Sequence, residues 1–335
     1  MKYLITGGAG YIGSHVVKQL IDKKNDIVIV DNLSTGLQKT INTLKKYADT
    51  KKVKLSFYKL DLADSKKLET VFAKEKVAGV IHFAASIVVP ESVIDPLKYY
   101  ANNTSNTINL IKACLKYKVN KFIFSSTAAV YGELDAKYIP AKEDGPVSPI
   151  NPYGQSKLFN EKIIQDVAFA NSKFKYVILR YFNVAGACLD GSIGQSSEKA
   201  TLLVKVCAEV ALGKRKKLTL FGTDYKTPDG TAIRDYIHVD DLASAHIKAL
   251  SYLNKNKSDI FNCGYGKGFS VQEVIDMMKK VSGVDFKVEK AGRRPGDPAV
   301  LISDNSKIKN KMDWQPKYDD LEIICRTALE WEKKI

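Results

Sequence analysis

The chain has 335 residues, enough for two domains, and its 45% hydrophobic and 27% charged residues are ordinary for a globular protein. It has no apolar run of about 18 residues, and its apolar start, MKYLIT, passes directly into glycines, so we expect neither a transmembrane helix nor a signal peptide. The net charge of +15 comes mainly from lysines spread along the whole chain. This distribution argues against nucleic-acid binding and favours an anionic small-molecule substrate.

Cysteine and histidine usage argues against two further classes of protein. The five cysteines form no C-x-x-C pair, and an odd number of widely spaced cysteines indicates free thiols in a reducing, cytoplasmic compartment. The four histidines lack the spacing of metal ligands, so no metal site is expected.

Through the first half of the chain, short apolar segments alternate with segments of helical periodicity. The apolar segments predict strands over residues 2–6, 26–30, 53–57, 77–83, 121–125 and 175–179. The periodic segments between them predict helices over residues 11–21, 65–74, 97–117 and 153–169. This alternation is typical of an α/β protein, and we expect a Rossmann-type doubly wound parallel sheet with helices on both faces.

After residue 180 the alternation loosens. Glycine and serine accumulate over 186–197, and a helix is predicted over 201–212. We therefore expect a Rossmann-type domain over 1–180 and a smaller α/β domain over 181–335, with part of 235–262 returning to the first domain.

A glycine loop follows the first predicted strand and opens the first predicted helix. The sequence TGGAGYIG places glycines at Gly7, Gly10 and Gly13. Glycine permits a tight turn and lets the backbone approach a pyrophosphate, while the helix N-terminus supplies N–H groups and partial positive charge. The loop in this strand–loop–helix context predicts dinucleotide binding.

An acidic residue indicates which dinucleotide is bound. Asp31 ends the second predicted strand, where a carboxylate can accept hydrogen bonds from ribose hydroxyls and would repel a 2′-phosphate. NAD is therefore the predicted cofactor rather than NADP. Asp61 and Leu62, which follow the third predicted strand, fit a pocket for the adenine.

Two further features suggest catalysis on an alcohol. Ser125-Ser126-Thr127 follows a predicted strand at the edge where such sheets bind ligands, and NPYGQSK places Tyr153 and Lys157 on one face of a helix. Taken alone, the hydroxyls could be loop polarity and the pair could belong to a surface helix. Together with the glycine loop they indicate an alcohol oxidoreductase site. There the lysine cation and an oxidised nicotinamide would lower the Tyr153 pKa from about 10, so that the phenol acts as acid and base.

Specific motifs along nearly the whole chain resemble one family. They read TGGAGYIGSH, DNLSTG, IHFAA, ESVIDPLKYYANN, FSSTAAVYGE, PYGQSK, LRYFNVAGA, FGTDY, DGTAIRDYIHVDDLASAH and RRPGDPA. The chain is similar to the extended short-chain dehydrogenase/reductases, and within them to the UDP-glucose 4-epimerase (UDP-galactose 4-epimerase) family.

The resemblance implies an NAD-binding first domain and a UDP-sugar-binding second domain. Together with the glycine loop, it predicts these cofactor-binding residues: Gly7, Gly10, Tyr11, Ile12, Gly13, Asp31, Asn32, Leu33, Ser34, Thr35, Gly36, Asp61, Leu62, Phe83, Ala84, Ala85, Ser86, Ile87, Asn103, Ser125, Tyr153, Lys157 and Phe182.

The resemblance also implies catalytic and substrate-binding roles. Tyr153 would be the acid/base, Lys157 its electrostatic partner, and Thr127 the hydroxyl that hydrogen-bonds the sugar O4. The substrate-binding residues would be Thr127, Tyr153, Asn183, Phe221, Arg234, Arg294, Asp297 and Leu301. Two of the six arginines occur here, and forked cationic donors suit a diphosphate, although isolated arginines are more often surface ion-pair partners.

The implied reaction is an isomerisation. UDP-galactose and UDP-glucose would be interconverted by oxidation at C4 with NAD, rotation of the 4-keto sugar and return of the hydride to its other face. The resemblance further suggests a homodimer formed through the helices predicted over 97–117 and 153–169.

Some positions depart from the family pattern and leave alternatives open. Gln195 replaces a common acidic residue, Thr201-Leu-Leu-Val-Lys205 replaces the usual start of the second-domain helix, and Ile87 stands where some members have lysine. Leu301 would disfavour an N-acetylated hexose. The alternatives are a 4-epimerase of UDP-GlcNAc, a UDP-pentose or UDP-glucuronate, and a non-catalytic NAD-binding regulator. A 4,6-dehydratase is disfavoured because Ala128-Ala129 follows Thr127 in place of Asp-Glu.

Overall fold

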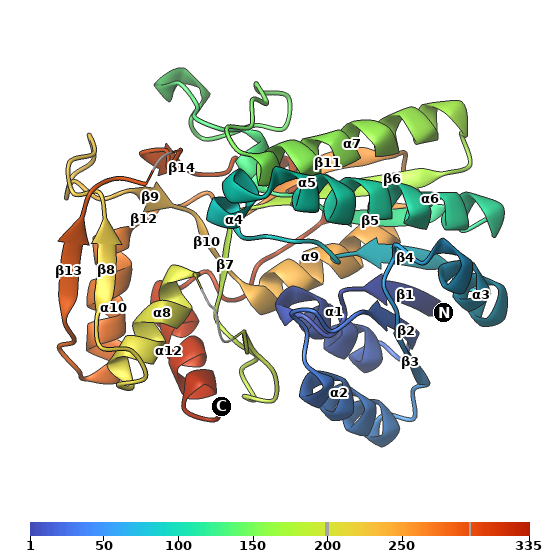
Figure 1. Cartoon of the computed structure of the whole chain (residues 1–335), viewed down its shortest axis with the longest axis horizontal. Helices are drawn as coiled ribbons and strands as arrows, with labels where there is room; N and C mark the ends of the chain where they lie inside the picture. The colour runs from blue at the N-terminus through green and yellow to red at the C-terminus, as the bar shows by residue number, and fades with distance from the viewer. Residues whose placement is uncertain (198–200, 295) are drawn as a thin grey trace. The chain divides into compact units, whose positions relative to one another are not determined.

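A computed structural model of the chain describes residues 1–197, 201–294 and 296–335 (Figure 1). These residues form two compact units. Unit 1 comprises Met1–Val130, Pro149–Arg180 and Ala243–Phe261, and unit 2 comprises Tyr131–Ser148, Tyr181–Leu242 and Asn262–Ile335. The sequence prediction counted 131–148 in the first domain, whereas these residues group with unit 2.

The centre of unit 1 is a seven-stranded sheet with the strand order β11-β6-β5-β4-β1-β2-β3. Its strands are β1 (Lys2–Thr6), β2 (Asp26–Asp31), β3 (Leu55–Lys59), β4 (Gly79–His82), β5 (Lys121–Ser125), β6 (Lys175–Tyr181) and β11 (Asp259–Cys263). Every pairing from β3 to β6 is parallel. The chain reverses its winding direction between β1 and β4, so the predicted Rossmann-type fold class is confirmed.

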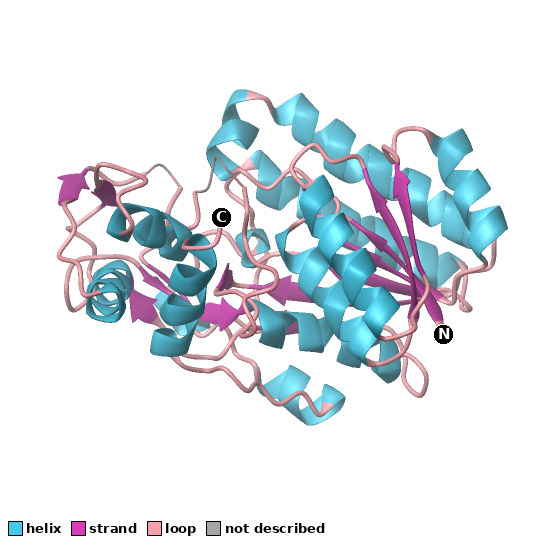
Figure 2. Ribbon diagram, turned by 90° about the horizontal axis from the view of Figure 1, so that it is seen from below, coloured by secondary structure: helices cyan, strands magenta, loops and turns pink. Residues whose placement is uncertain are grey.

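The strands are apolar on both faces because helices cover both faces of the sheet (Figure 2). Alternate residues such as Val28 and Val30 of β2 pack in a core with α3 (Ser65–Glu75), α6 (Asn106–Lys116) and α7 (Pro152–Ala170). Residues between them, such as Ile27 and Ile29, point to the opposite face. That face is covered by α1 (Tyr11–Asp22) and α2 (Gln38–Thr50) (Figure 1).

Some elements differ from the prediction for local physical reasons. The helix predicted over 97–117 is divided into α5 (Pro96–Tyr99), a π-helical turn η1 (Tyr100–Ser105) and α6. Helix α2 was not predicted, because only Ile41, Leu44 and Ala48 of it are buried and the apolar stripe is narrow. Neither was the short helix α4 (Val89–Ile94).

Unit 2 combines small sheets with a group of helices (Figure 1). Strand β7 (Asn183–Ala185) pairs with β10 (Tyr236–His238), and β8 (Leu218–Phe221) pairs with β13 (Val288–Ala291). A third sheet has the order β12 (Phe269–Ser270), β9 (Ile233–Arg234), β14 (Val300–Leu301). The longer helices are α8 (Leu203–Ala211), α10 (Val271–Ser282) and α12 (Leu321–Glu332), which pack on one another.

The remaining elements are short or cross from one unit to the other. They are the 3₁₀ turns η2 (Ala128–Val130) and η3 (Ala136–Tyr138), helix α11 (Ser306–Met312), and helix α9 (Val239–Tyr252), whose later part belongs to unit 1. Among the described residues, no helix is both long enough and apolar enough to cross a membrane.

One buried ion pair joins α7 to β6. The Arg180 Nη2 donates to Glu161 Oε2 at 2.7 Å, and the Arg180 Nε donates to both carboxylate oxygens. The two side chains are only 5% and 0% exposed. Ser126 also donates its hydroxyl to Glu161, so the carboxylate is fully committed.

We predict that Arg180→Leu lowers the free energy of unfolding by about 3–5 kcal/mol, because it leaves the Glu161 charge buried without its cation. Lys116→Ala breaks an exposed ion pair with Glu69 and is the matched control, for which we expect about 0–1 kcal/mol. Urea denaturation measures both. Equal, small losses in the two variants would contradict the prediction.

Candidate active site

The glycine loop between β1 and α1 contains two positions that only glycine fits. Gly7 has φ +70°, and a Cβ there would lie 2.8 Å from the backbone nitrogen of Ala84. A Cβ on Gly13 would lie 2.3 Å from the carbonyl oxygen of Gly7. The first turn of α1 has neither a side-chain cap nor an acidic residue. This is the arrangement of a helix N-terminus that receives an anion.

Asp31 is the acidic group at the end of β2. Its side chain accepts the backbone N–H of Ala9 at 3.0 Å and that of Leu33 at 2.8 Å. Burial raises the pKa of the Asp31 carboxyl, and these two hydrogen bonds lower it. Since a carboxylate has capacity for further donors, the position suits two ribose hydroxyls. Asn32 donates to Asp61 at 2.7 Å, which joins the loops after β2 and β3.

Asn103 ties the segment after β4 to helix α7. Its Oδ1 accepts the Ser86 N–H at 2.8 Å, and its Nδ2 donates to the Ser86 carbonyl and to the Ser156 hydroxyl, both at 3.0 Å. Asn103 lies in the π-helical turn η1, and such turns are frequent at functional sites. Ile87, by contrast, is 58% exposed.

The other predicted cofactor residues of unit 1 also follow strands of the sheet. They lie in the first turn of α1 (Tyr11, Ile12), between β2 and α2 (Ser34, Thr35, Gly36), after β3 (Leu62) and after β4 (Phe83, Ala84, Ala85). The parallel pairing brings all these strand ends to one edge of the sheet.

Tyr153 and Lys157 project from the first turns of α7. The Asn151 side chain caps this helix by accepting the Gly154 N–H at 2.9 Å. Gly154 has to be glycine, because a Cβ there would lie 2.7 Å from the carbonyl oxygen of Ala129. The helix therefore begins in contact with the turn after β5. This contact places the Tyr153 phenol in a hydrogen bond with the Thr127 hydroxyl.

Lys157 is a buried ammonium group with a backbone partner. Its Nζ donates to the Ser125 carbonyl at 2.8 Å and lies 5.0 Å from the centre of the Phe124 ring. Burial lowers the Lys157 pKa to about 7, although the nearby Glu161 carboxylate raises it. The side chain is thus held where a change of local charge can change its protonation.

In the protein alone, the Tyr153 pKa lies above its usual value. Burial of the side chain raises it, and the hydrogen bond with Thr127 lowers it only in part. The reason is the loss of water around the phenol, which is 7% exposed. The lowered pKa stays a prediction for the protein with an oxidised nicotinamide bound.

The hydroxyls of the two serines before Thr127 have hydrogen-bond partners within the protein. The Ser125 hydroxyl lies 2.7 Å from His246 Nε2, and Ser126 donates to Glu161. Both serines are 0% exposed. The run of hydroxyls therefore does not act as one unit, and only Thr127 reaches the tyrosine.

Sequence reasoning missed two buried groups beside this site. His82 lies 2.7 Å from the Thr6 hydroxyl and 2.8 Å from that of Thr107, and burial lowers its pKa to about 3, so it is neutral. The Tyr99 hydroxyl donates to the Val88 carbonyl at 2.6 Å, and its ring meets that of Tyr153 edge-on. Both residues lie within motifs quoted above, IHFAA and ESVIDPLKYYANN, but those motifs do not show which partners the two side chains contact.

In unit 2, four predicted substrate residues form two pairs. The guanidinium of Arg294 lies 3.9 Å from the centre of the Phe221 ring. Arg234 forms an ion pair with Asp297 and donates to the Ile233 carbonyl at 2.8 Å. Leu301 stands opposite Arg234 in the pairing of β14 with β9. Arg234 thus forms an ion pair, but it is buried and not the surface ion-pair partner of the alternative interpretation. Its role in substrate binding stays a prediction.

The other predicted residues of unit 2 lie near β7. The backbone N–H of Asn183 donates a hydrogen bond to the Asp235 carbonyl next to the β7–β10 pairing. The centre of the Phe182 ring lies 6.4 Å from that of the Tyr131 ring. In the atypical segment 195–205, the Gln195 carbonyl accepts the Trp331 indole N–H. Residues 198–200, and Pro295 of the RRPGDPA motif, lie outside the described residues. Across the described ranges, no three His, Cys, Asp or Glu side chains come together as a metal site.

Comparison with known proteins decides the family. The model of the NAD dependent epimerase/dehydratase family matches residues 3–264. The chain belongs to this family. The resemblance inferred from the motifs is thereby confirmed.

Epimerases of several bacteria are similar over their full length. A UDP-glucose 4-epimerase of Azospirillum brasilense is 46% identical, covering 100% of this chain and 92% of the relative. The structure of a UDP-Glc/GlcNAc 4-epimerase from Campylobacter jejuni is 58% identical with a TM-score of 0.86, covering 100% and 99%. A UDP-glucose 4-epimerase from Bifidobacterium longum, solved with NAD+ and UDP, is 37% identical with a TM-score of 0.94, covering 100% and 98%.

The cofactor of this epimerase/dehydratase family is NAD, and unit 1 fits it. The glycine loop leaves no room for a Cβ at Gly7 or Gly13, so backbone alone faces the place for a pyrophosphate. Asp31 is held by backbone N–H groups where ribose hydroxyls can donate to it.

We predict that Thr127→Val moves the acid limb of the pH–rate profile to higher pH. The Thr127 hydrogen bond lowers the Tyr153 pKa, so its loss raises the pH at which the phenolate forms. Epimerisation rates between pH 5 and 9 measure this. Thr127→Ser keeps the hydroxyl and should leave the acid limb of the profile at the same pH. An unchanged acid limb in the valine variant would show that Thr127 does not lower the Tyr153 pKa.

Proposed function

We propose that the chain interconverts UDP-galactose and UDP-glucose with bound NAD. The observation that carries the proposal is the buried Tyr153, bonded to Thr127 and followed by Lys157, in the unit that holds the glycine loop and Asp31. The full-length similarity to UDP-glucose 4-epimerases supports the choice of substrate.

Tyr153 is the group that moves a proton. As a phenolate it accepts the proton of the sugar O4 hydroxyl, and it returns that proton when the hydroxyl is restored. NAD, when bound, supplies the hydride acceptor for C4 and afterwards the donor. Thr127 orients O4, and Lys157 is the cation of the site, held in place by the Ser125 carbonyl.

The substrate-binding residues must hold UDP firmly while the sugar turns. Arg294, stacked on Phe221, and Arg234, oriented by Asp297, supply always-charged forked donors for a diphosphate. Asn183 supplies a neutral amide. Firm contacts to UDP and few contacts to the hexose let the 4-keto sugar rotate and take the hydride on its other face.

A second candidate substrate is UDP-N-acetylglucosamine. The Campylobacter jejuni enzyme, at 58% identity, is described as acting on both UDP-Glc and UDP-GlcNAc. This similarity is evidence against the expectation that Leu301 disfavours an N-acetylated hexose. Product analysis with both pairs of UDP-sugars decides between them.

We also propose that the chain works as a cytoplasmic homodimer. Leu97 before η1 and Phe159 on α7 are 77% and 43% exposed, and Phe159 packs against Tyr100 at 5.8 Å between ring centres. Leu97 lies on α5 and Tyr100 on η1, and both of these elements contact α7, so the apolar groups lie on neighbouring elements of unit 1. The five cysteines are buried free thiols, which suits a reducing compartment.

Tyr153→Phe should reduce turnover of UDP-galactose by about 10²–10⁴-fold or more, because no other group replaces the phenol as acid and base. Its NAD content should stay unchanged, since the ring and its packing remain. Coupled detection of UDP-glucose and chromatography of the released cofactor measure the two quantities. Near-normal turnover in this variant would refute the assignment of Tyr153.

For the dimer, we predict that Leu97→Lys combined with Phe159→Lys yields a monomer in analytical ultracentrifugation, because two charges would be buried in an apolar interface. Phe169→Lys, at a side chain that is 95% exposed at the far end of α7, is the control that should stay dimeric. A monomeric parent protein would contradict the proposal.

A further inference from the structure

The last helix of unit 2 holds the segment that follows β7. Segment 187–197 has few backbone hydrogen bonds of its own, among them that from Cys188 N–H to the Ile193 carbonyl at 3.0 Å and that from Gly191 N–H to the Cys188 carbonyl at 2.8 Å. Its conformation therefore depends on what it packs against. Along its length, that partner is α12 and the turn after it.

Three side chains from this end of the chain bind the segment at successive points. Thr327 Oγ1 accepts the Ala187 N–H at 3.2 Å, and the Trp331 indole N–H donates to the Gln195 carbonyl at 3.0 Å. Lys334 Nζ donates to the Gly191 carbonyl at 3.1 Å. Thr327 and Trp331, at i and i+4, share one side of α12, so one face of this helix reaches both ends of the segment, while Lys334 lies in the turn after it.

The fit between segment and helix is close. A Cβ on Gly194 would lie 2.5 Å from Cγ of the Trp331 indole, and one on Gly191 would lie 2.1 Å from Lys334 Nζ. Gly194 and Gly191 thus lie directly against Trp331 of α12 and Lys334 of the turn after it. This segment, in which glycine and serine accumulate, is held by specific contacts.

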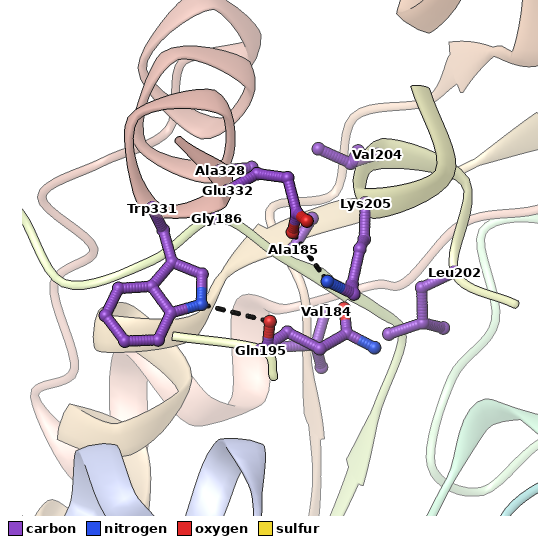
Figure 3. Close-up of a pocket in the computed structure, with 10 residues that line it drawn as sticks. All are labelled: Val184, Ala185, Gly186, Gln195, Leu202, Val204, Lys205, Ala328, Trp331 and Glu332. Atoms are coloured by element: carbon purple, nitrogen blue, oxygen red, sulfur yellow. Dashed lines mark hydrogen bonds and ion pairs between the residues drawn. The ribbon is translucent and has the colours of Figure 1, made fainter. Parts of the chain in front are cut away.

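A buried ion network next to Trp331 also fixes α12 (Figure 3). Lys205 of α8 forms ion pairs with Glu332 at 2.6 Å and with Glu209 at 3.2 Å, and these side chains are 7%, 4% and 8% exposed. Lys214 also binds Glu332, at 2.8 Å. The helix cannot shift without breaking charges that are out of water.

Trp331 and this network enclose a small cavity against β7. Its walls include Val184 and Ala185, the two residues that follow Asn183 (Figure 3). Anything that moves the segment or α12 therefore moves the backbone next to a residue that we assign to UDP-sugar binding.

We propose that Trp331 is a positioning residue for the nucleotide sugar. Its indole N–H donates a hydrogen bond to the Gln195 carbonyl, and its ring packs against Gly194. Through these two contacts it holds segment 187–197 and β7 in the conformation that binds the substrate. It touches neither UDP-sugar nor NAD. This inference rests on the proposed function, because it names what orders the substrate-binding part of that site.

The test separates substrate affinity from chemistry. Trp331→Phe removes the indole N–H and keeps a ring on Gly194, and we expect the KM for UDP-galactose to rise about fivefold with kcat nearly unchanged. Trp331→Ala should raise KM further and speed hydrogen exchange of the amides in segment 187–197. NAD content should stay unchanged in both. Glu330→Ala, at an exposed neighbour on the same helix, is the control and should behave as the parent.

A double-mutant cycle keeps the proposal testable if Trp331→Ala is unstable. Gly194→Ala alone should raise KM, because its new Cβ collides with the indole. Combined with Trp331→Phe it should raise KM as well. Combined with Trp331→Ala it should add little, because the space is then free. An unchanged KM and unchanged hydrogen exchange of segment 187–197 in the Trp331 variants would overturn the positioning role of Trp331. Absence of turnover in the parent protein would instead overturn the proposed function.

Discussion

The site in unit 1 depends on an ammonium group kept out of water. Lys157 is 2% exposed, and its charge is met by a backbone carbonyl, that of Ser125, rather than by a directly bonded carboxylate. A directly paired carboxylate would cancel the positive field that a phenolate needs. A carbonyl holds the side chain in position and leaves most of that field intact. The C-terminal end of β5 and the first turn of α7 must therefore lie close together. The lack of a side chain on Gly154, which packs against the Ala129 carbonyl, permits this.

Burial has opposite effects on the two titrating groups. It raises the pKa of the Tyr153 phenol and lowers that of the Lys157 ammonium, so both tend toward their neutral forms in the protein alone. Both effects disfavour the charged pair that the reaction uses. A cofactor carrying positive charge would favour the phenolate.

Much of unit 1 could be predicted because its signals are local. Strand β1 and strand β5 have the predicted bounds, since each is a short apolar run bounded by polar or glycine residues. The glycine loop and the spacing of Tyr153 and Lys157 are likewise contained in a few consecutive residues. The π-helical turn at Asn103 was not predictable, because it depends on Ser86 and Ser156, which are distant in the sequence. The same holds for His82, whose partners come from β1 and α6.

Unit 2 was less predictable for a related reason. Its strands are two to four residues long and carry no periodicity, and the partners of segment 187–197 lie more than a hundred residues away on α12. Glycine and serine accumulate in that segment, and the structure shows that two of the glycines permit close packing on Trp331 and Lys334. The sequence also could not show that Arg234 is oriented by Asp297, although both residues were assigned to one site.

The burial of all five thiols has a practical consequence. Thiol-directed labels react with the thiolate, and burial raises the pKa of the Cys114, Cys207, Cys263 and Cys325 thiols. A cysteine introduced at Leu189, which is 55% exposed within the segment held by α12, would be the most reactive thiol of the folded chain. A fluorophore attached there would report the motion of that segment during turnover, without prior removal of the native cysteines.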